Sequence, residues 1–331
     1  MKKYLTILLL IVCELVYSQD PHFSQFYSNP LYLSSSFAGL TDDNRLNLNY
    51  RNQWPEISRG YQTYSASFDK AIDKFNSGIG IFILQDVAGT GSLRNTNIGI
   101  FYSYDFKLGK NLHLRPGLNF AYTEGSIYFD RLLWYDQIYP DKNNPVSSEV
   151  FPMNKTGDID FSSSLMMYNE KFWLGTSVDH ILQPNQSFYY TYNGGTNPGR
   201  VPIKYTIYGG YKLSTQESLL RSIPVNAQFT FIYREQGEFR QLDLGLYVNR
   251  SPLVMGLWYR GIPLYKEFFN RDAFTVLVGV KNKNLSIGYS YDFTISKLFG
   301  NTGGSHEISI SYSFKTNIKI ERKKMVPCPE F

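Results

Sequence analysis

The sequence reads Leu285-Ser286-Ile287-Gly288-Tyr289-Ser290-Tyr291-Asp292-Phe293-Thr294-Ile295, and apolar and polar residues alternate along this stretch without a break. The same alternation returns ten residues later in Ser305–Phe314. Successive side chains of a strand point to opposite faces, so each segment has one apolar and one polar face. In a soluble sheet the apolar face covers a core, whereas in an outer-membrane barrel it faces lipid.

Alternating segments of this kind recur along the whole chain, and fourteen of them can be placed. An even number is what single-chain bacterial barrels require. The expected strands are Arg45–Gln53, Tyr61–Asp69, Ser77–Asp86, Asn95–Phe106, Leu112–Glu124, Asp158–Tyr168, Lys171–His180, Ile203–Leu213, Pro224–Arg234, Phe239–Asn249, Leu253–Arg260, Ala273–Val280, Leu285–Ile295 and Ser305–Phe314.

The lengths of the predicted connections give a second indication. With a periplasmic N-terminus, short turns such as Asn169–Glu170 and Arg250–Pro252 fall on the periplasmic side. The two longest connections, Gly125–Gly157 and Ile181–Pro202, fall on the extracellular side. This asymmetry is typical of outer-membrane barrels. We therefore expect an all-β fold, a transmembrane outer-membrane β-barrel of about 14 antiparallel strands.

A large periplasmic sandwich or a lipocalin-like barrel is the soluble alternative. It would need a second set of apolar residues inside, yet the predicted inner face is mostly Ser, Asn, Gly, Thr and charged residues. It would also leave a band of apolar side chains exposed to water, far larger than a normal surface patch. The membrane interpretation is therefore preferred.

The composition and the first residues fit this interpretation. Aromatic residues make up 17% of the 331 residues. Residues 1–18 are expected to form a signal peptide, with Lys2 and Lys3 before an apolar run and Val16-Tyr17-Ser18 as the cleavage site. Cys13 would suggest a lipoprotein, but Val12 stands where a small residue is expected. The formal net charge of +5 argues against nucleic acid as a main partner.

No residues with the spacing of a catalytic or metal-binding site are found. The four histidines, His22, His113, His180 and His306, are scattered, and Cys328 would be the one thiol left after removal of the signal peptide. Ser305, His306 and Glu307 are adjacent, so a strand would point them to alternate faces. We expect a protein without catalytic activity, metal or cofactor.

Three regions are candidate partner-binding sites. Residues 19–43 are expected to form a periplasmic plug or cap before the barrel (44–315), because they are dense in aromatic residues such as Phe23, Phe26 and Tyr27. The alternative is a loosely ordered terminus. Residues 316–331 are expected to form a basic periplasmic tail that docks a partner or is merely solvated. The two long loops are rich in aromatic residues, as recognition surfaces often are. The remaining candidates are Trp134, Tyr135, Tyr189 and Tyr190 in the loops, and Arg322, Lys323, Lys324, Cys328 and Phe331 in the tail.

Several motifs resemble those of the PorP/SprF family of Bacteroidetes outer-membrane proteins. They are the start Gln19–Pro30, Tyr50–Pro55, Gly256–Pro263, Ile287–Thr294, Gly304–Ser309 and the ending Cys328-Pro329-Glu330-Phe331. One departure is Ser34-Ser35-Ser36 before Phe37-Ala38-Gly39, where the family usually has an Asn-Pro-Ala turn.

The resemblance implies an outer-membrane component of, or accessory to, the type IX secretion system, which in some species also serves gliding motility. It implies periplasmic and outer-membrane machinery as partners, with lipid around the barrel, and possible secretion or display of a large adhesin. A passive diffusion channel for small solutes is the alternative, because a barrel of this size can enclose a channel.

Overall fold

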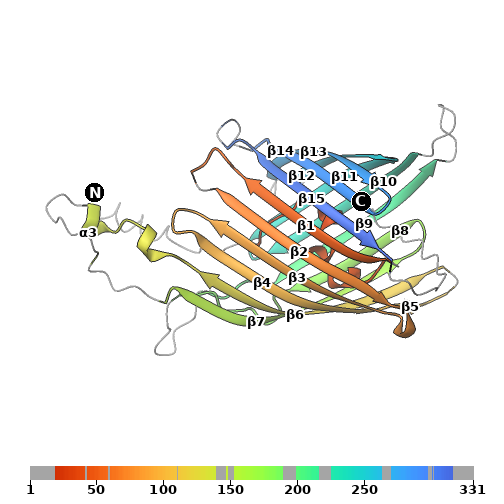
Figure 1. Ribbon diagram of the computed structural model, residues 1–331, viewed down its shortest axis with the longest axis horizontal. Coiled ribbons are helices and arrows are strands. Elements are labelled where there is room, and N and C mark those ends of the chain that lie inside the picture. The colour runs from red at the N-terminus through yellow and green to blue at the C-terminus, as the bar shows by residue number, and fades with distance from the viewer. Residues whose placement is uncertain are drawn as a thin grey trace.

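The computed structural model describes residues 19–41, 43–58, 60–109, 111–138, 147, 153–188, 199–215, 225–262, 270–296, 300 and 302–315. A single antiparallel sheet curls until its first and last strands meet (Figure 1). At this seam Asn44 pairs with Phe314, and Gln53 pairs with Ser305. The sheet is therefore a closed barrel.

The strands are β1 (Asn44–Gln53), β2 (Tyr61–Ile72), β3 (Ser77–Ala88), β4 (Leu93–Tyr104), β5 (Phe106–Lys107), β6 (His113–Ser126), β7 (Lys155–Tyr168), β8 (Phe172–Asp179), β9 (Lys204–Thr215), β10 (Val225–Gln236), β11 (Phe239–Arg250), β12 (Leu253–Ile262), β13 (Asn270–Asn282), β14 (Leu285–Thr294) and β15 (Ser305–Phe314). Both β4 and β5 pair with β6, on either side of Asp105. They share one strand position, so the fifteen named strands make a barrel of fourteen positions. The predicted fold class is confirmed.

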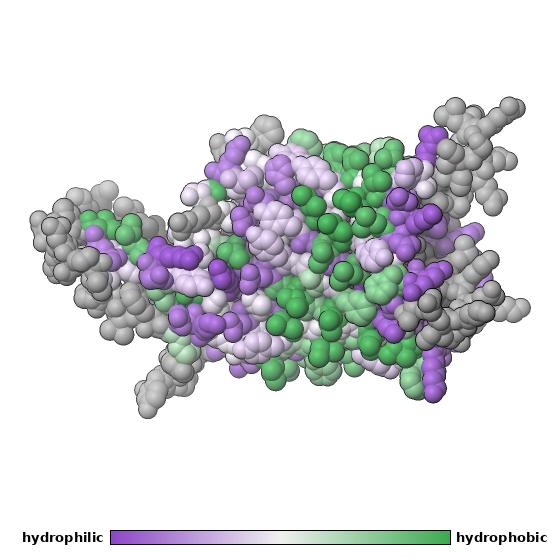
Figure 2. Space-filling view, viewed as in Figure 1, coloured by the Kyte–Doolittle hydropathy of each residue, from purple (hydrophilic) through white to green (hydrophobic). Residues whose placement is uncertain are grey.

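The outer face of the barrel is apolar, as the alternation predicts. Ile100 and Phe120 expose 65% and 63% of their surface, while their neighbours in the chain turn inward. Figure 2 shows hydrophobic residues in a band across the middle of the barrel, with hydrophilic residues toward both ends. Such a band is the lipid-facing belt of a membrane barrel. Among the described residues no helix is long and apolar enough to cross a membrane.

The two ends of the barrel differ. At one end β6–β7 and β8–β9 are joined by the longest connections, and the first of these contains η4 (Phe129–Arg131) and α3 (Tyr135–Ile138). At the other end β7–β8, β11–β12 and β13–β14 are joined by two or three residues (Figure 1). We call these the long-loop end and the short-turn end. In outer-membrane barrels the long loops are extracellular and the short turns periplasmic.

Residues 19–40, which we call the lumen segment, lie inside the barrel. They include η1 (Phe26–Ser28), α2 (Pro30–Leu33) and η2 (Ser35–Phe37). Nearly all of these residues are buried. Two prolines, Pro21 and Pro30, keep the segment from forming one long helix, because proline breaks a helix interior. The result is a compact chain of single turns within the lumen.

The inner wall is mostly polar, as the sequence predicts, but it also contains large aromatic residues. Strands β1, β14 and β15 present Ser, Asn and charged residues inward, as expected. Strands β8 to β12 also present polar residues such as Thr206, Thr230 and Asp243, and among them stand a few large aromatic side chains. These are Trp173, Tyr208, Tyr247 and Trp258, and the lumen segment packs against them.

Candidate functional site: the occupied lumen

The lumen segment runs along the barrel from one end to the other. Near its start, Asp20 contacts Lys204, the first residue of β9, at the long-loop end. Near its finish, the backbone nitrogen of Gly39 donates to Asp69, close to the short-turn end of β2. The chain then enters β1 from the short-turn end. The region predicted to plug or cap the periplasmic face thus lies within the lumen and reaches the opposite end.

An apolar core fixes the lumen segment to one side of the wall. Phe26 packs edge-on against Trp258, with ring centroids 5.1 Å apart, and Tyr27 packs edge-on against Tyr247 at 4.9 Å. Further along, Phe37 lies 5.5 Å from the ring of Tyr208. Burial of several aromatic side chains, each contributing about 1.5–3 kcal/mol, makes this contact strongly favourable.

A carboxylate holds the opposite side of the segment. The backbone nitrogens of Ser24 and Gln25 donate to the two carboxylate oxygens of Glu307, at 2.7 and 2.9 Å. The amide of Gln25 donates to the backbone oxygen of Glu307 and to the hydroxyl of Ser290. The hydroxyl of Ser309 donates to the oxygen of the same amide. Every polar group of Gln25 named here has a partner, so this contact is specific as well as buried.

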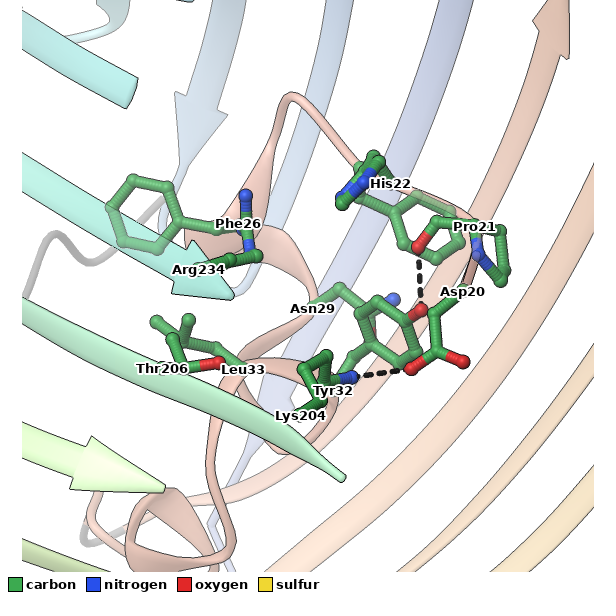
Figure 3. A pocket seen from close by; sticks show the side chains of 11 residues that line it. Asp20, Pro21, His22, Phe26, Asn29, Tyr32, Leu33, Lys204, Thr206 and Arg234 are labelled. Carbon is green, nitrogen blue, oxygen red and sulfur yellow. Dashed lines mark hydrogen bonds and ion pairs between the residues drawn. The ribbon is translucent and has the colours of Figure 1, made fainter. Parts of the chain in front are cut away.

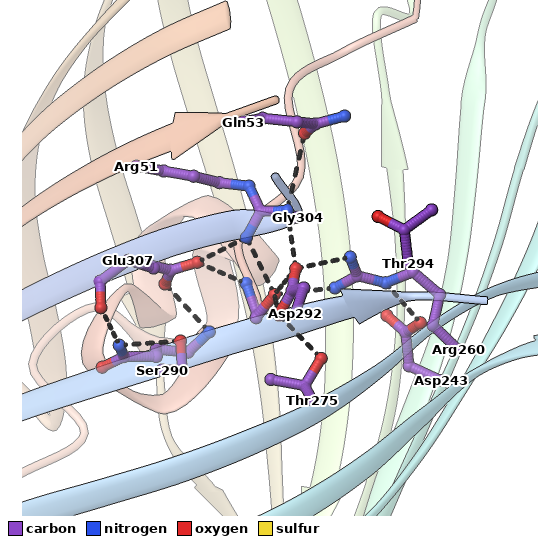
Figure 4. Close-up of polar contacts among 12 residues, drawn as sticks. Arg51, Gln53, Asp243, Arg260, Thr275, Ser290, Asp292, Thr294, Gly304 and Glu307 are labelled. Atoms are coloured by element: carbon purple, nitrogen blue, oxygen red, sulfur yellow. Dashed lines mark hydrogen bonds and ion pairs between the residues drawn. The ribbon is translucent and has the colours of Figure 1, made fainter. Parts of the chain in front are cut away.

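Glu307 also belongs to a network of buried arginines and carboxylates that project from the wall into the lumen (Figure 4). Arg51 of β1 contacts Asp292 at 2.7 Å and Glu307 at 3.1 Å. Arg260 of β12 contacts Asp292 and Asp243, each at 3.2 Å. All five side chains are buried, so each charge depends on its partners for compensation. The network joins β1 to β11, β12, β14 and β15 through the lumen.

A second ionic cluster lies at the start of the segment. The Asp20 carboxylate accepts from Lys204 at 2.6 Å (Figure 3). It also contacts Nε2 of His180 at 2.9 Å. Nδ1 of His180 lies 2.7 Å from Asp160. Burial disfavours the protonated ring, but the charge of Asp20 and the hydrogen bonds to Asp160 and Asp20 outweigh it and raise the pKa of His180 to about 10. His180 is therefore a cation at neutral pH and holds Asp20 in place.

Toward the short-turn end the lumen segment lies in close backbone contact with the wall. A Cβ added to Gly117 would lie 2.4 Å from the backbone of Ser35 and Ser36, so only glycine permits this approach. The hydroxyls of both serines lie 2.7 Å from that of Ser164 on β7. These serines attach the segment to the wall. Arg115 closes the adjoining gap by donating to the backbone oxygen of Ala38.

The long-loop end remains hollow. A cavity of about 640 Å³ lies above the start of the lumen segment. Its lining includes Gln19 to His22 of the segment, Gln53 and Tyr61 near the β1–β2 loop, and Asp86 of β3. The lumen segment forms part of the lining. A smaller cavity of about 60 Å³ continues beside the segment, lined by Asn95, Asn119 and Ser162 of the wall and reaching Ser35.

The structure distributes the predicted partner-binding residues unevenly. Phe23, Phe26 and Tyr27 are buried against the barrel's own side chains. Trp134 lies in the long β6–β7 loop beside Phe129, and Tyr135 begins α3. The remaining seven lie outside the described residues: Tyr189, Tyr190, Arg322, Lys323, Lys324, Cys328 and Phe331. A partner-binding role stays a prediction for all twelve, and the five described ones lie in two separate places, the lumen and the β6–β7 loop.

Sequence reasoning did not single out the network of Arg51, Arg260, Asp292 and Glu307. One signal was available, since charged residues occur at inward positions of otherwise apolar and serine-rich strands. In the described part of the chain, no group of three or more His, Cys, Asp or Glu side chains is placed to hold a metal ion.

Comparison with known proteins gives a family. The model of the family described as type IX secretion system membrane protein PorP/SprF matches residues 15–312. No curated protein matches the chain.

Similar solved structures include CdiB from Acinetobacter baumannii, at 9% identity and a TM-score of 0.42, with 82% of this chain and 60% of CdiB covered. Omp33 from the same organism has 4% identity and a TM-score of 0.43, covering 83% and 99%. A Pseudomonas aeruginosa FadL homologue has 12% identity and a TM-score of 0.40, covering 82% and 90%.

Proposed function

Since the chain belongs to the PorP/SprF family and is an outer-membrane component of the type IX secretion system, we propose that it acts as a closed, non-enzymatic docking barrel. In this role it binds other components of the machinery, and helps secrete or display a cell-surface adhesin. The partners would be proteins at the two rims of the barrel rather than solutes inside it.

The observation that carries the proposal is the filled lumen. A diffusion channel needs a continuous polar path, whereas here the lumen segment, an apolar core and a buried charge network fill much of the lumen and leave a cavity of about 60 Å³ beside the segment. A segment attached to β1, β7, β9, β14 and β15 is part of the folded core rather than a loose constriction. The two rims of the barrel are then the surfaces that remain for binding other proteins.

The long β6–β7 loop supports docking at the long-loop end. Around η4 and α3 it extends away from the barrel wall (Figure 1). Leu133 and Ile138 expose 78% and 64% of their surface there, outside the lipid-facing belt. Apolar side chains exposed to water in this way are typical of surfaces that a partner covers. Trp134 and Tyr135 lie between them in the sequence.

The test is a mild-detergent purification through a tag inserted after Gly89, at a turn where a Cβ would meet no atom within 4 Å. Mass spectrometry should identify secretion components or one large adhesin among the co-purified proteins. The matched variant carries Leu133→Ser and Ile138→Ser and should lose the partner held at that loop. If the unmodified protein and the Leu133→Ser, Ile138→Ser variant both purify without other proteins, the proposal is contradicted.

The diffusion channel is the second candidate, because a cavity of about 640 Å³ already occupies the long-loop end. Planar-bilayer recordings distinguish the two. The docking barrel should be silent as the full chain and conduct once residues 19–38 are deleted. Steady conductance by the full chain would favour the channel.

A further inference from the structure

Basic residues mark the short-turn end of the barrel. Every connection described at this end has an exposed Lys or Arg in the turn or at the strand end beside it, and another follows the last strand. The six residues, which we call the basic ring, come from points spread around the circumference. They are Lys74 between β2 and β3, Lys107 in β5, Lys171 between β7 and β8, Arg250 at the end of β11, Lys283 between β13 and β14, and Lys315 after β15.

Acidic residues do not balance the ring. Among the described residues of this end, Glu170 is exposed, while Asp43 and Asp73 are half-buried. The long-loop end is different, because basic and acidic side chains are interspersed there, and Lys155 pairs with Glu124 at 3.2 Å. Positive charge is thus concentrated at one rim of the barrel.

The basic ring lies next to aromatic residues of the lipid-facing surface. Lys74 lies over the ring of Phe75, 5.6 Å from its centroid, and Phe75 is largely exposed. Lys107 follows Phe106 and Lys315 follows Phe314, and both of these aromatic rings are exposed. Aromatic residues at the rim of a membrane barrel mark the boundary between hydrocarbon and headgroups. Lys107 and Lys315 each lie one strand residue, about 3.3 Å, beyond such a ring, so their backbones are at headgroup depth. Because adjacent side chains of a strand point to opposite faces, each of these two side chains starts on the inner side of the rim and reaches the headgroups around the strand end.

We propose that the basic ring binds the phosphates of anionic phospholipids in the leaflet at the short-turn end. A long, flexible Lys side chain at this depth extends toward the headgroups while its methylenes stay on apolar surface. Each lysine near an anionic lipid surface contributes favourably to binding. The ring would fix the depth of the barrel and select the lipids around it.

The distribution of the charges favours lipid over an acidic partner protein. One docked protein covers a single sector of a barrel rim, whereas these six residues occur at separate turns around it. Lipid is the one partner that surrounds the barrel on all sides. The proposal requires only the membrane barrel, so it stands or falls independently of the proposed role in secretion.

The experiment uses the full chain reconstituted in phosphatidylcholine vesicles containing a trace of spin-labelled lipid. Electron paramagnetic resonance gives the fraction of label immobilised at the protein. We expect spin-labelled phosphatidylglycerol to associate about fivefold more strongly than spin-labelled phosphatidylcholine at low salt, which corresponds to about 1 kcal/mol. At about 1 M salt the preference should largely disappear, because the Debye length falls to about 3 Å.

Two variants with four substitutions each separate position from total charge. The ring variant carries Lys74→Gln, Lys107→Gln, Lys171→Gln and Lys283→Gln, and should lose the preference. The control carries Arg131→Gln, Lys155→Gln, Arg200→Gln and Arg271→Gln at the long-loop end, and should retain it. Folding of both is checked by gel mobility without boiling. The proposal is overturned if the two variants show the same preference for phosphatidylglycerol, or if the unmodified chain shows none. If a variant does not fold, the salt dependence of the unmodified chain is the test, and a preference that persists at high salt overturns the proposal.

Discussion

The backbone nitrogen of Ser24 donates to a carboxylate oxygen of Glu307 across 2.7 Å, although 283 positions separate the two residues in the chain. Glu307 belongs to the last strand, and its carboxylate also contacts Arg51 of the first strand. The beginning of the lumen segment is therefore attached at the seam where the barrel closes.

Replacing Glu307 with Gln should destabilise the barrel by about 3–5 kcal/mol, because Arg51 keeps its buried charge but loses one of its two carboxylates. Urea titration read by gel mobility without boiling measures the loss. The matched control is Glu170→Gln, an exposed carboxylate in the β7–β8 turn, which should change stability by less than about 0.5 kcal/mol. Similar midpoints for the two variants would mean that the network contributes little.

Replacing Phe26 with Ala should loosen the lumen segment without opening the sheet. The ring packs among Trp173, Tyr247 and Trp258, and its removal leaves a cavity that costs about 3–5 kcal/mol. Protease should then cleave within residues 19–40 while the barrel remains intact. Phe26→Leu retains most of the volume and should stay protected. Equal resistance of both variants would argue against this core as the anchor.

Replacing Gly117 with Ala should break the seal at the short-turn end. The new methyl group would overlap the backbone of Ser35 and Ser36, which must move away from β6. Single-channel recordings should show openings that the unmodified chain lacks. Gly109→Ala, at a turn where a Cβ meets nothing within 4 Å, is the control and should remain silent. If the Gly117→Ala variant also shows no channel openings, the contact of Gly117 with Ser35 and Ser36 is not what blocks the lumen.

The cluster of His180 and Asp20 should make the barrel less stable as the solution becomes alkaline. The folded pKa of about 10 lies above the ordinary value of 6.5. A raised pKa means that the folded state binds the proton more tightly, so its contribution is complete below about pH 6.5 and is lost as the pH rises through about 10. The loss, on the order of a few kcal/mol, should be absent in His180→Gln. Urea midpoints measured between pH 6 and pH 10 for both proteins provide the test, and parallel curves would contradict it.

Much of the fold could be predicted because alternation is a local property. The stretch from Leu285 to Ile295 shows its two faces in the sequence, and β14 ends one residue before the predicted boundary. The interruption at Asp105, which separates β5 from β4, leaves the count of strand positions unchanged.

The occupied lumen could not be predicted in the same way. Trp173 and Trp258 occupy inward positions of strands whose outward positions are also apolar, so alternation does not reveal what they face. The pairing of Ser24 with Glu307 depends on where the lumen segment folds back, and no period in the sequence encodes that. Aromatic density in Gln19–Gly39 indicated a packed segment, but not the surface against which it packs.

Because Gln25 contacts β14 and β15 while Ser28 contacts Asn49 of β1, the lumen segment bridges the two edges of the sheet. A sheet whose edges have not yet met offers the segment only one side of this contact. We therefore expect the closing of the seam and the filling of the interior to occur together during assembly. An intermediate with an open seam would have both an unpaired strand edge and an incomplete core. Completing the barrel around residues 19–40 removes both defects and is therefore thermodynamically favoured.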